Sequence, residues 1–293
     1  MKIRTIAFIG IGRMGRPMAA RLVGAGYALR IFDKLARPRL AGATMCRSAA
    51  EAARGADVLI TMLPDGKAVR AALLGRDGAA PALEPRGIVV DMSSSDPMAT
   101  RKLGAELSAR GIVLLDARVS GRVDGARAGT LTIMAGGKAA TLKKVRPVLE
   151  LLGKRIFLAG ALGAGHAVKA LNNYIAAAGT IAAFEAVIVG RAFGLDPALM
   201  TDIFNSSAGR NSTTENKVKQ QVLSRRFSSG FALALMAKDV GIAADLARSL
   251  GVDAPLARKT RDLWRAARNG LPGDADHTEI YRYLDALARK RKS

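Results

Sequence analysis

The sequence has 293 residues, of which 49% are hydrophobic, so it is long enough for two domains and can bury a substantial core. Its single cysteine, Cys46, excludes an internal disulfide bond and is typical of a reducing compartment. The formal net charge of +22 is compatible with nucleic acid, a membrane surface or small anionic molecules as partners.

The distribution of the charge narrows these partner classes. The arginines are scattered along the chain, and only the tail RKRKS, residues 289–293, forms a basic cluster. Aromatic residues make up 4% of the sequence, too few to alternate with the basic residues as stacking platforms for nucleic-acid bases. We therefore interpret the charge as an arginine-rich solvated surface and do not expect nucleic acid as a partner.

Strand and helix patterns alternate over about the first 150 residues, which predicts a doubly wound parallel sheet. Short apolar runs ending at Gly or at polar residues are typical of buried parallel strands. The predicted strands cover residues 3–10, 28–33, 56–64, 87–94 and 112–117, and the helices between them cover residues 16–26, 67–74 and 98–110.

Helical patterns alone follow Gly160, and the glycines of residues 159–165 mark the change. We predict a dinucleotide-binding Rossmann domain over residues 1–162 and an all-helical domain for substrate binding and oligomerisation over residues 163–293. The run YIAAAGTIAAFEAVIVGRAFG predicts a long helix, and its interruption by Glu185 and Arg191 favours a core helix over a membrane span. With no signal-peptide pattern at the N-terminus, a soluble cytoplasmic protein without a membrane partner is expected.

The segment GIGRMG, Gly10 to Gly15, fits the pattern G-x-G-x-x-G between the first predicted strand and the first predicted helix. Gly10 permits a tight turn, Gly12 lets the backbone approach a pyrophosphate, and Gly15 lets the helix pack on the strand. The helix N-terminus then offers N–H donors and a positive dipole end to the phosphates. Asp33, at the end of the second strand, is placed to bind the adenosine ribose.

Asp33 also bears on the choice between the two nicotinamide cofactors. A carboxylate at this position repels a 2′-phosphate, which favours NAD over NADP. Lys34, Arg37 and Arg39 follow closely and could neutralise part of that repulsion. We predict NAD as the cofactor, with NADP remaining open.

Four stretches together resemble the β-hydroxyacid dehydrogenase family. GIGRMGRPMAARL resembles its cofactor loop, and DARVSGRVDGARAGTLTIMAGG, residues 116–137, resembles its substrate-binding signature. GAGHAVKALNN, residues 163–173, resembles its catalytic helix, and FALALMAKDVGIA, residues 231–243, its C-terminal Lys-Asp segment. The resemblance implies a Rossmann domain, a long interdomain helix, a helical C-terminal domain, an active site between the domains and a homodimer or homotetramer.

The resemblance also implies roles for individual residues. It makes Lys169 the catalytic group. Arg118 stands where the family commonly has proline, and Arg122 replaces the second glycine of a common Ser-Gly-Gly, so the substrate cannot be copied from any one member. The implied substrate-binding residues are Ser120, Gly121 and Asn173. We add Asn172 and Arg122 as candidates, with a solvent-exposed surface charge as the alternative for Arg122. The implied cofactor-binding residues are Gly10, Gly12, Arg13, Met14, Gly15, Asp33, Leu63, Pro64, Ser94 and Lys238.

Hydride transfer from an alcohol needs a group that accepts the proton. Lys169 and Asn173 are four residues apart and so share one helix face. The reference pKa of lysine, about 10.4, is too high for a base near neutrality, so this role requires burial, which lowers the pKa. His166 is an alternative base that we interpret as structural, and His277, with no motif around it, is predicted at the surface. One cysteine and two distant histidines do not make a metal-ligand set.

The leading hypothesis is an enzyme that transfers a hydride between NAD and a small 3-hydroxy carboxylic acid similar to 3-hydroxyisobutyrate. One alternative is an NADP-dependent semialdehyde reductase. Another is a non-catalytic dehydrogenase-like module that binds polyanions, and a third is an imine reductase on a similar scaffold. The retained Lys169, Asn173 and Ser120 favour the enzyme hypotheses over the binding module, and Lys169 favours the hydroxyacid family over the imine reductases.

Overall fold

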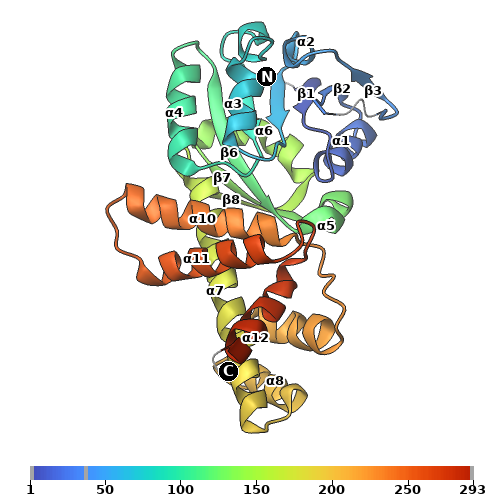
Figure 1. Ribbon diagram of the computed structural model, residues 1–293. Coiled ribbons are helices and arrows are strands. Elements are labelled where there is room, and N and C mark those ends of the chain that lie inside the picture. The colour runs from blue at the N-terminus through green and yellow to red at the C-terminus, as the bar shows by residue number, and fades with distance from the viewer. Residues whose placement is uncertain (1–2, 36–38, 291–293) are drawn as a thin grey trace. The chain divides into compact units, whose positions relative to one another are not determined.

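The computed structural model describes residues 3–35 and 39–290 (Figure 1). Arg37 and the end of the basic tail, residues 291–293, lie outside the described residues. Contacts divide the chain into two compact units, Met1–Lys169 and Ala170–Ser293, so the division falls within the helix α7 (Ala164–Phe193). The domain boundary predicted from the sequence lies a little earlier, between residues 162 and 163.

The first unit is built on an eight-stranded sheet with the order β3-β2-β1-β4-β5-β6-β7-β8. The strands from β3 to β6 are parallel, which confirms the predicted Rossmann architecture. The last two strands differ, because β7 is antiparallel to β6 and β8 is parallel to β7. The strands are β1 (Thr5–Ile9), β2 (Ala28–Phe32), β3 (Ala43–Met45), β4 (Val58–Thr61), β5 (Ile88–Asp91), β6 (Val113–Ser120), β7 (Leu131–Gly136) and β8 (Gly153–Gly160).

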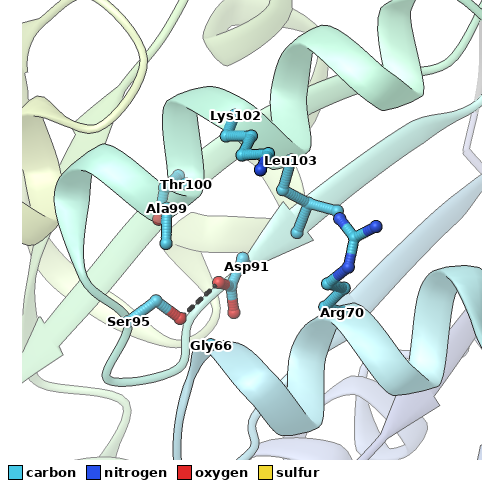
Figure 2. Close-up of a pocket in the computed structure, with 8 residues that line it drawn as sticks. All are labelled: Gly66, Arg70, Asp91, Ser95, Ala99, Thr100, Lys102 and Leu103. Carbon is cyan, nitrogen blue, oxygen red and sulfur yellow. Dashed lines mark hydrogen bonds between the residues drawn. The ribbon is translucent and has the colours of Figure 1, made fainter.

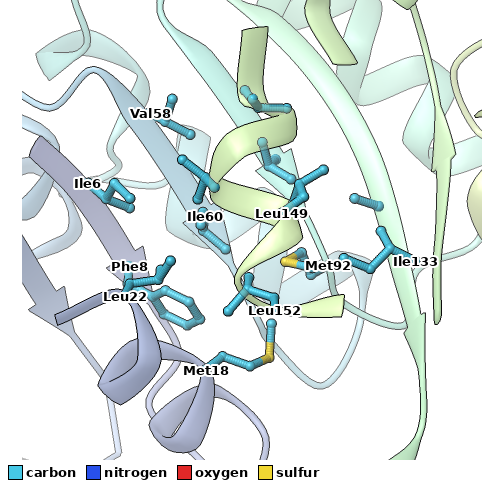
Figure 3. Packing of buried hydrophobic residues seen from close by; sticks show 14 of the residues in the cluster. Ile6, Phe8, Met18, Leu22, Val58, Ile60, Met92, Ile133, Leu149 and Leu152 are labelled. Atoms are coloured by element: carbon cyan, nitrogen blue, oxygen red, sulfur yellow. The ribbon is translucent and has the colours of Figure 1, made fainter. Parts of the chain in front are cut away.

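Helices cover both faces of this sheet because alternate strand residues point to opposite sides. Ile6 and Phe8 pack against side chains of α1 and α6 on one face, as Figure 3 shows. Ala7 and Ile9 pack on the other face, against α2, α3 and α4. The helices of this unit are α1 (Gly15–Gly24), α2 (Ala49–Ala53), α3 (Gly66–Leu74), α4 (Pro97–Ser108), α5 (Arg122–Ala128) and α6 (Ala139–Glu150), with a 3-10 turn at Ala80–Ala82.

The second unit is helical throughout its described residues, apart from one isolated bridge between Ala232 and Asp276. Its core surrounds Phe184 of α7 and Trp264 of α11, which are both fully buried. Its elements are the greater part of α7, α8 (Pro197–Asn205), α9 (Ser212–Asn216), a π-helix (Val218–Leu223), α10 (Leu233–Ser249), α11 (Pro255–Gly270), a 3-10 turn (His277–Glu279) and α12 (Ile280–Lys290).

Helix α7 is long and apolar enough to cross a membrane by length and composition alone. However, 44% of its most apolar window is buried within the protein, and the core helices of soluble proteins meet the same criterion. Ala177, Ile181, Phe184 and Ile188 lie on the buried face, packed into the core of the second unit. This packing supports the interpretation of α7 as a core helix.

The prediction that His277 lies at the surface is wrong, because its side chain is 4% exposed. Its Nδ1 lies 2.9 Å from the Ser229 hydroxyl and 3.1 Å from the Phe231 carbonyl oxygen. Asp276 beside it accepts hydrogen bonds from the backbone N–H groups of Gly230 and Phe231. Burial opposes ionisation of Asp276, but the surrounding hydrogen bonds, including one from His277, outweigh it and lower the pKa of this carboxyl. These hydrogen bonds fix residues 229–231, which precede α10.

Candidate active site

The glycine-rich loop joins β1 to α1 as the sequence predicts. Gly10 has a φ of +98°, and a Cβ atom there would lie 2.4 Å from the Met62 carbonyl oxygen. A Cβ at Gly15 would lie 1.9 Å from the Gly10 carbonyl oxygen, so neither position accepts a side chain without a backbone shift. Gly12 differs, since a Cβ there meets no atom within 4 Å. Beside it, Arg13 is exposed and Met14 is half-buried.

Asp33 follows β2 and holds the glycine-rich loop in place. Its Oδ2 accepts a hydrogen bond of 2.8 Å from the Ile11 N–H, and its Oδ1 accepts one of 2.9 Å from the Leu35 N–H. The Gly10 N–H also donates to the Phe32 carbonyl oxygen at 2.9 Å. The carboxylate therefore stands at the edge of the loop, where a ribose hydroxyl is expected in this fold.

The loops after β4 and β5 are tied together through Asp91. Its Oδ1 accepts bonds from the Thr61 hydroxyl at 2.8 Å and from the Ser93 N–H at 2.9 Å. The Ser93 hydroxyl in turn accepts a bond of 2.8 Å from the Leu63 N–H. These loops and the glycine-rich loop all follow the carboxyl ends of adjacent parallel strands, which is the ligand-binding edge of a doubly wound sheet. The predicted contact residues Pro64 and Ser94 are exposed and half-buried, respectively.

A cavity of about 220 Å³ lies beside Asp91, between α3 and α4 (Figure 2). Its lining includes Asp91 and Ser95, joined by the hydrogen bond of 3.0 Å that Figure 2 draws. Arg70, also in the lining, pairs with Glu106. Since these charged groups already have protein partners, we assign no ligand to this cavity.

The predicted catalytic and substrate-binding residues of the first unit come together at the end of β6. Lys169, in the second turn of α7, donates a hydrogen bond of 3.0 Å from its Nζ to the Ser120 hydroxyl. The backbone after Ser120 turns through Gly121, with a φ of +138°, and Arg122, with a φ of +57°. The second value lies in the left-handed region that favours glycine, which is the residue commonly found there in the family that this chain resembles.

The predicted residues of the second unit lie on α7 and α10. Asn173, which is buried, donates a hydrogen bond of 2.5 Å from Nδ2 to Asp239 Oδ2 and accepts one of 3.2 Å from Asn172 Nδ2. Lys238, half-buried, precedes Asp239 on α10. Asp239 is not among the residues predicted from the sequence, although it belongs to the Lys-Asp pair of residues 231–243.

Two family models match the chain in succession. Residues 5–160 match the NAD binding domain of 6-phosphogluconate dehydrogenase, and residues 163–284 match the NAD-binding domain of NADP-dependent 3-hydroxyisobutyrate dehydrogenase. The chain belongs to the β-hydroxyacid dehydrogenase family. As a member of this family it is an NAD(P)-dependent hydroxyacid oxidoreductase.

Individual members of the family are similar over nearly the full length. The NAD-dependent L-serine dehydrogenase of Pseudomonas aeruginosa is 38% identical, with 97% of this chain and 98% of the relative covered. The 2-(hydroxymethyl)glutarate dehydrogenase of Eubacterium barkeri is 36% identical, with 96% of this chain and 95% of the relative covered. The solved structure of Mycobacterium tuberculosis 3-hydroxyisobutyrate dehydrogenase with L-serine superposes with a TM-score of 0.89 at 36% identity, covering 97% of this chain and 99% of that one.

The site of this dehydrogenase fits a dinucleotide cofactor by its own geometry. The open space at Gly12 leaves the loop backbone accessible directly before the N-terminus of α1. Among residues 3–35 and 39–290, no cluster of three or more His, Cys, Asp or Glu side chains is arranged to hold a metal ion.

Proposed function

We propose that this dehydrogenase oxidises a small 3-hydroxy carboxylic acid with NAD and that Lys169 is its general acid and base. The observation that carries the proposal is the hydrogen bond of 3.0 Å from Lys169 Nζ to the Ser120 hydroxyl. It brings a lysine and a hydroxyl together at the end of β6, in the unit that also holds the glycine-rich loop. When bound, the nicotinamide supplies the hydride acceptor or donor.

Lys169 moves the proton that hydride chemistry requires. In the oxidative direction its neutral amine takes the proton of the substrate hydroxyl, and in the reductive direction its ammonium donates a proton to the forming alcohol oxygen. The Ser120 hydroxyl fixes the orientation of Nζ. Asn173 lies on the same helix, four residues after Lys169. Its hydrogen bond to Asp239 fixes the orientation of its amide.

The substrate carboxylate needs hydrogen-bond donors. We assign this task to the Ser120 hydroxyl, to the backbone N–H groups around Gly121, and to the amides of Asn172 and Asn173. Hydrogen bonds to a charged group contribute about 1.5–3 kcal/mol each, so two or three of them suffice to select acids over simple alcohols.

The direct test is an NAD-reduction screen over hydroxy acids that differ in chain length, in the position of the hydroxyl and in the presence of a second charge. Turnover of 3-hydroxy acids above 2-hydroxy acids and simple alcohols supports the proposal. Turnover restricted to alcohols without a carboxylate contradicts it. The alternative of an NADP-dependent semialdehyde reductase predicts a higher kcat/KM with NADPH and an aldehyde acid than with NAD and the hydroxy acid.

Asp33 is expected to set the preference between the two cofactors. Replacing Asp33 with asparagine removes the repulsion of a 2′-phosphate and weakens both the ribose contact and the loop bond to the Ile11 N–H. The ratio of kcat/KM for NAD over NADP should fall by about 10–100-fold, the equivalent of about 1.5–3 kcal/mol for a hydrogen bond to a charged group. Steady-state kinetics with both cofactors measures this ratio. A wild-type preference for NADP would show instead that the basic residues after Asp33, among them Lys34 and Arg39, dominate.

Arg122 supports a narrower proposal about the substrate. A left-handed backbone costs an L-residue other than glycine about 1–2 kcal/mol, yet this chain places an arginine there. Its guanidinium can present a planar fork to a second anionic or hydroxyl-rich group on the substrate. We propose that the preferred substrate is more polar than 3-hydroxyisobutyrate.

The variant Arg122→Gly should leave the free energy of unfolding unchanged or raised, because glycine adopts this φ without strain. Binding of a doubly charged hydroxy acid should weaken by about 1.5–3 kcal/mol, with little change for a singly charged one. Kinetics on matched mono- and dicarboxylic substrates measure the difference, and Arg127→Ala, which removes an exposed arginine from the same helix α5, is the control. Equal effects on both substrates contradict a contact.

The outer face of α7 supports a proposal about the oligomeric state. Leu171, Ile175, Val189 and Phe193 are 43–83% exposed, and their spacing puts them within about 40° of one another on a helix of 3.6 residues per turn. The opposite face of α7 packs into the core of the second unit. A continuous apolar stripe on a helix of this kind suits a two-fold interface, in which each copy presents the same surface. We propose that a second copy of this chain covers it.

The variant Val189→Asp should therefore shift the protein from the oligomer to the monomer, because an unpaired carboxylate in an apolar interface is costly to desolvate. Size-exclusion chromatography with light scattering measures the mass. Leu250→Asp, at an apolar residue that is 58% exposed on a different segment, should leave the mass unchanged. A monomeric wild-type protein, or one that instead binds neutral-lipid vesicles, contradicts the proposal.

A further inference from the structure

Asp116 caps helix α7 from a distant strand. The helix begins after Gly163, which has no side chain to satisfy the first N–H groups. Asp116 of β6 takes this place, since its Oδ1 accepts the Gly163 N–H at 2.6 Å and its Oδ2 accepts the His166 N–H at 2.8 Å. Asp116 is fully buried, and burial raises the pKa of its carboxyl although His166 and the two backbone bonds oppose this effect.

Two glycines allow the first turn of α7 to approach the sheet this closely. A Cβ at Gly136, which pairs with Asp116 across β6 and β7, would lie 2.4 Å from Asp116 Oδ1 and 2.8 Å from the Ala164 nitrogen. A Cβ at Gly165 would lie 2.1 Å from the Met134 carbonyl oxygen. The helix backbone and the strands are therefore in direct contact around the carboxylate.

The same strand and the same helix meet a second time, three residues after His166. Ser120 lies four residues after Asp116 on β6, and its hydroxyl accepts the bond from Lys169 Nζ. Because side chains two and four residues apart point to the same face of a strand, Asp116 and Ser120 face α7 together. The first tie, from Asp116 to the backbone at the start of α7, fixes where the helix begins. The second tie, between Ser120 and Lys169, involves the amine to which we assign the proton transfer.

His166 connects the first tie to the cofactor loops. The Thr100 hydroxyl donates its proton to the Asp96 carbonyl oxygen, so it accepts the hydrogen bond of 2.9 Å from His166 Nδ1. The other ring nitrogen, Nε2, is buried without a hydrogen-bond partner and lies 3.8 Å from Asp91 Oδ2. Asp91 is the carboxylate that organises the loops after β4 and β5. The imidazole therefore lies between two buried carboxylates, 3.8 Å from Asp91 Oδ2 and 3.8 Å from Asp116 Oδ2, and its hydrogen bond to Thr100 anchors the helix turn before Lys169.

We propose that Asp116 is a positioning residue for the reaction: it fixes the first turn of α7 along β6 so that the Lys169 amine is held against Ser120. The inference rests on the proposed role of Lys169, through which Asp116 acts. Asp116 itself need not touch the substrate or cofactor. Loss of the cap leaves two N–H groups without their acceptor and frees the turn that carries the lysine.

The test is a double-mutant cycle with Asp116→Asn and Lys169→Ala. Asparagine keeps the size of the side chain but replaces one acceptor oxygen with an NH₂ group that opposes a backbone donor. In the wild-type background kcat should fall by about 10–100-fold, as expected for a displaced catalytic group, with the Kd for NAD unchanged. In the Lys169→Ala background the same change should lower kcat by less than about 2-fold, since no amine remains to be positioned.

A matched control separates positioning from stability. Asp57 also accepts two backbone N–H bonds, from Arg4 and Thr5, but at the start of β1. Asp57→Asn should lower the thermal midpoint to a similar extent while kcat stays at the wild-type value. If Asp116→Asn does not fold, Gly165→Ala, which pushes the same helix turn away from Met134, replaces it in the cycle with the same expectation.

The outcomes distinguish this inference from the proposed function. If Lys169→Ala keeps wild-type turnover, the role of Lys169 is wrong and the positioning role falls with it. If Lys169→Ala loses turnover but Asp116→Asn does not, only the positioning role is overturned. Equal losses from Asp116→Asn in both backgrounds overturn it as well, because they indicate a structural role.

Discussion

Replacing Lys169 with alanine is expected to lower kcat by about 10²–10⁴-fold, the range for loss of a general acid or base. The hydrogen bond from Nζ to the Ser120 hydroxyl shows that the amine reaches the end of β6, within the segment that resembles the substrate-binding signature. No other described lysine or histidine makes a hydrogen bond with Ser120. If Lys169 is the proton acceptor, as we propose, the variant removes it without a substitute.

The affinity for NAD should remain nearly unchanged in this variant, because the glycine-rich loop and Asp33 lie on other segments of the first unit. Pre-steady-state turnover and calorimetric titration of the cofactor measure the two quantities separately. Lys144→Ala, at an exposed lysine of α6, is the control and should keep both values. A folded Lys169→Ala protein with near wild-type kcat would remove this residue from the mechanism.

Replacing Gly12 with valine is expected to raise the Kd for NAD by about 100-fold or more without unfolding the protein. The first side-chain atom is accommodated in the free enzyme, since a Cβ there meets no atom within 4 Å. That room is the space through which the loop backbone approaches a pyrophosphate. Blocking it removes charge-assisted hydrogen bonds that contribute about 1.5–3 kcal/mol each, and the loss of two accounts for the expected change.

Thermal unfolding and cofactor titration test both halves of this expectation. Gly24→Val, at the end of α1, is a suitable control because a Cβ there also meets nothing within 4 Å. It should bind NAD as the wild type does. Normal affinity in the Gly12 variant would show that the cofactor does not approach this loop.

Sequence patterns predict the strands and the turn of the cofactor-binding part because each of these elements depends on residues that are close together in the sequence. Continuous apolar runs identify β1, β4 and β5, and the glycine spacing identifies the turn after β1. Strand β8 was not predicted because it lies at the edge of the sheet, where Lys154 and Arg155 are exposed and interrupt the apolar pattern. Strand β3 is only three residues long, too short for a periodic signal.

Long-range partners could not be predicted in the same way. His277 is buried by contacts with Ser229 and Phe231, which are 48 and 46 residues away in the sequence. Asp116 looked like the polar end of a strand, and nothing in its neighbourhood announces that it caps a helix 47 residues later. The resemblance to a family drew attention to these stretches, but only the structure reveals which atoms they bring together.

The two ties between β6 and α7 limit where the sequence of such an enzyme can gain or lose residues. From Asp116 to Ser120 a strand advances about 13 Å, and from Gly163 to Lys169 a helix advances about 9 Å, so both lengths are set by backbone geometry. Insertion of one residue in either stretch would turn every later side chain away from its partner. Residues 121–130, which include Arg122, lie outside these two stretches of fixed length. Changes of sequence or length in that segment therefore leave the spacing between Asp116 and Ser120, and between Gly163 and Lys169, unaltered.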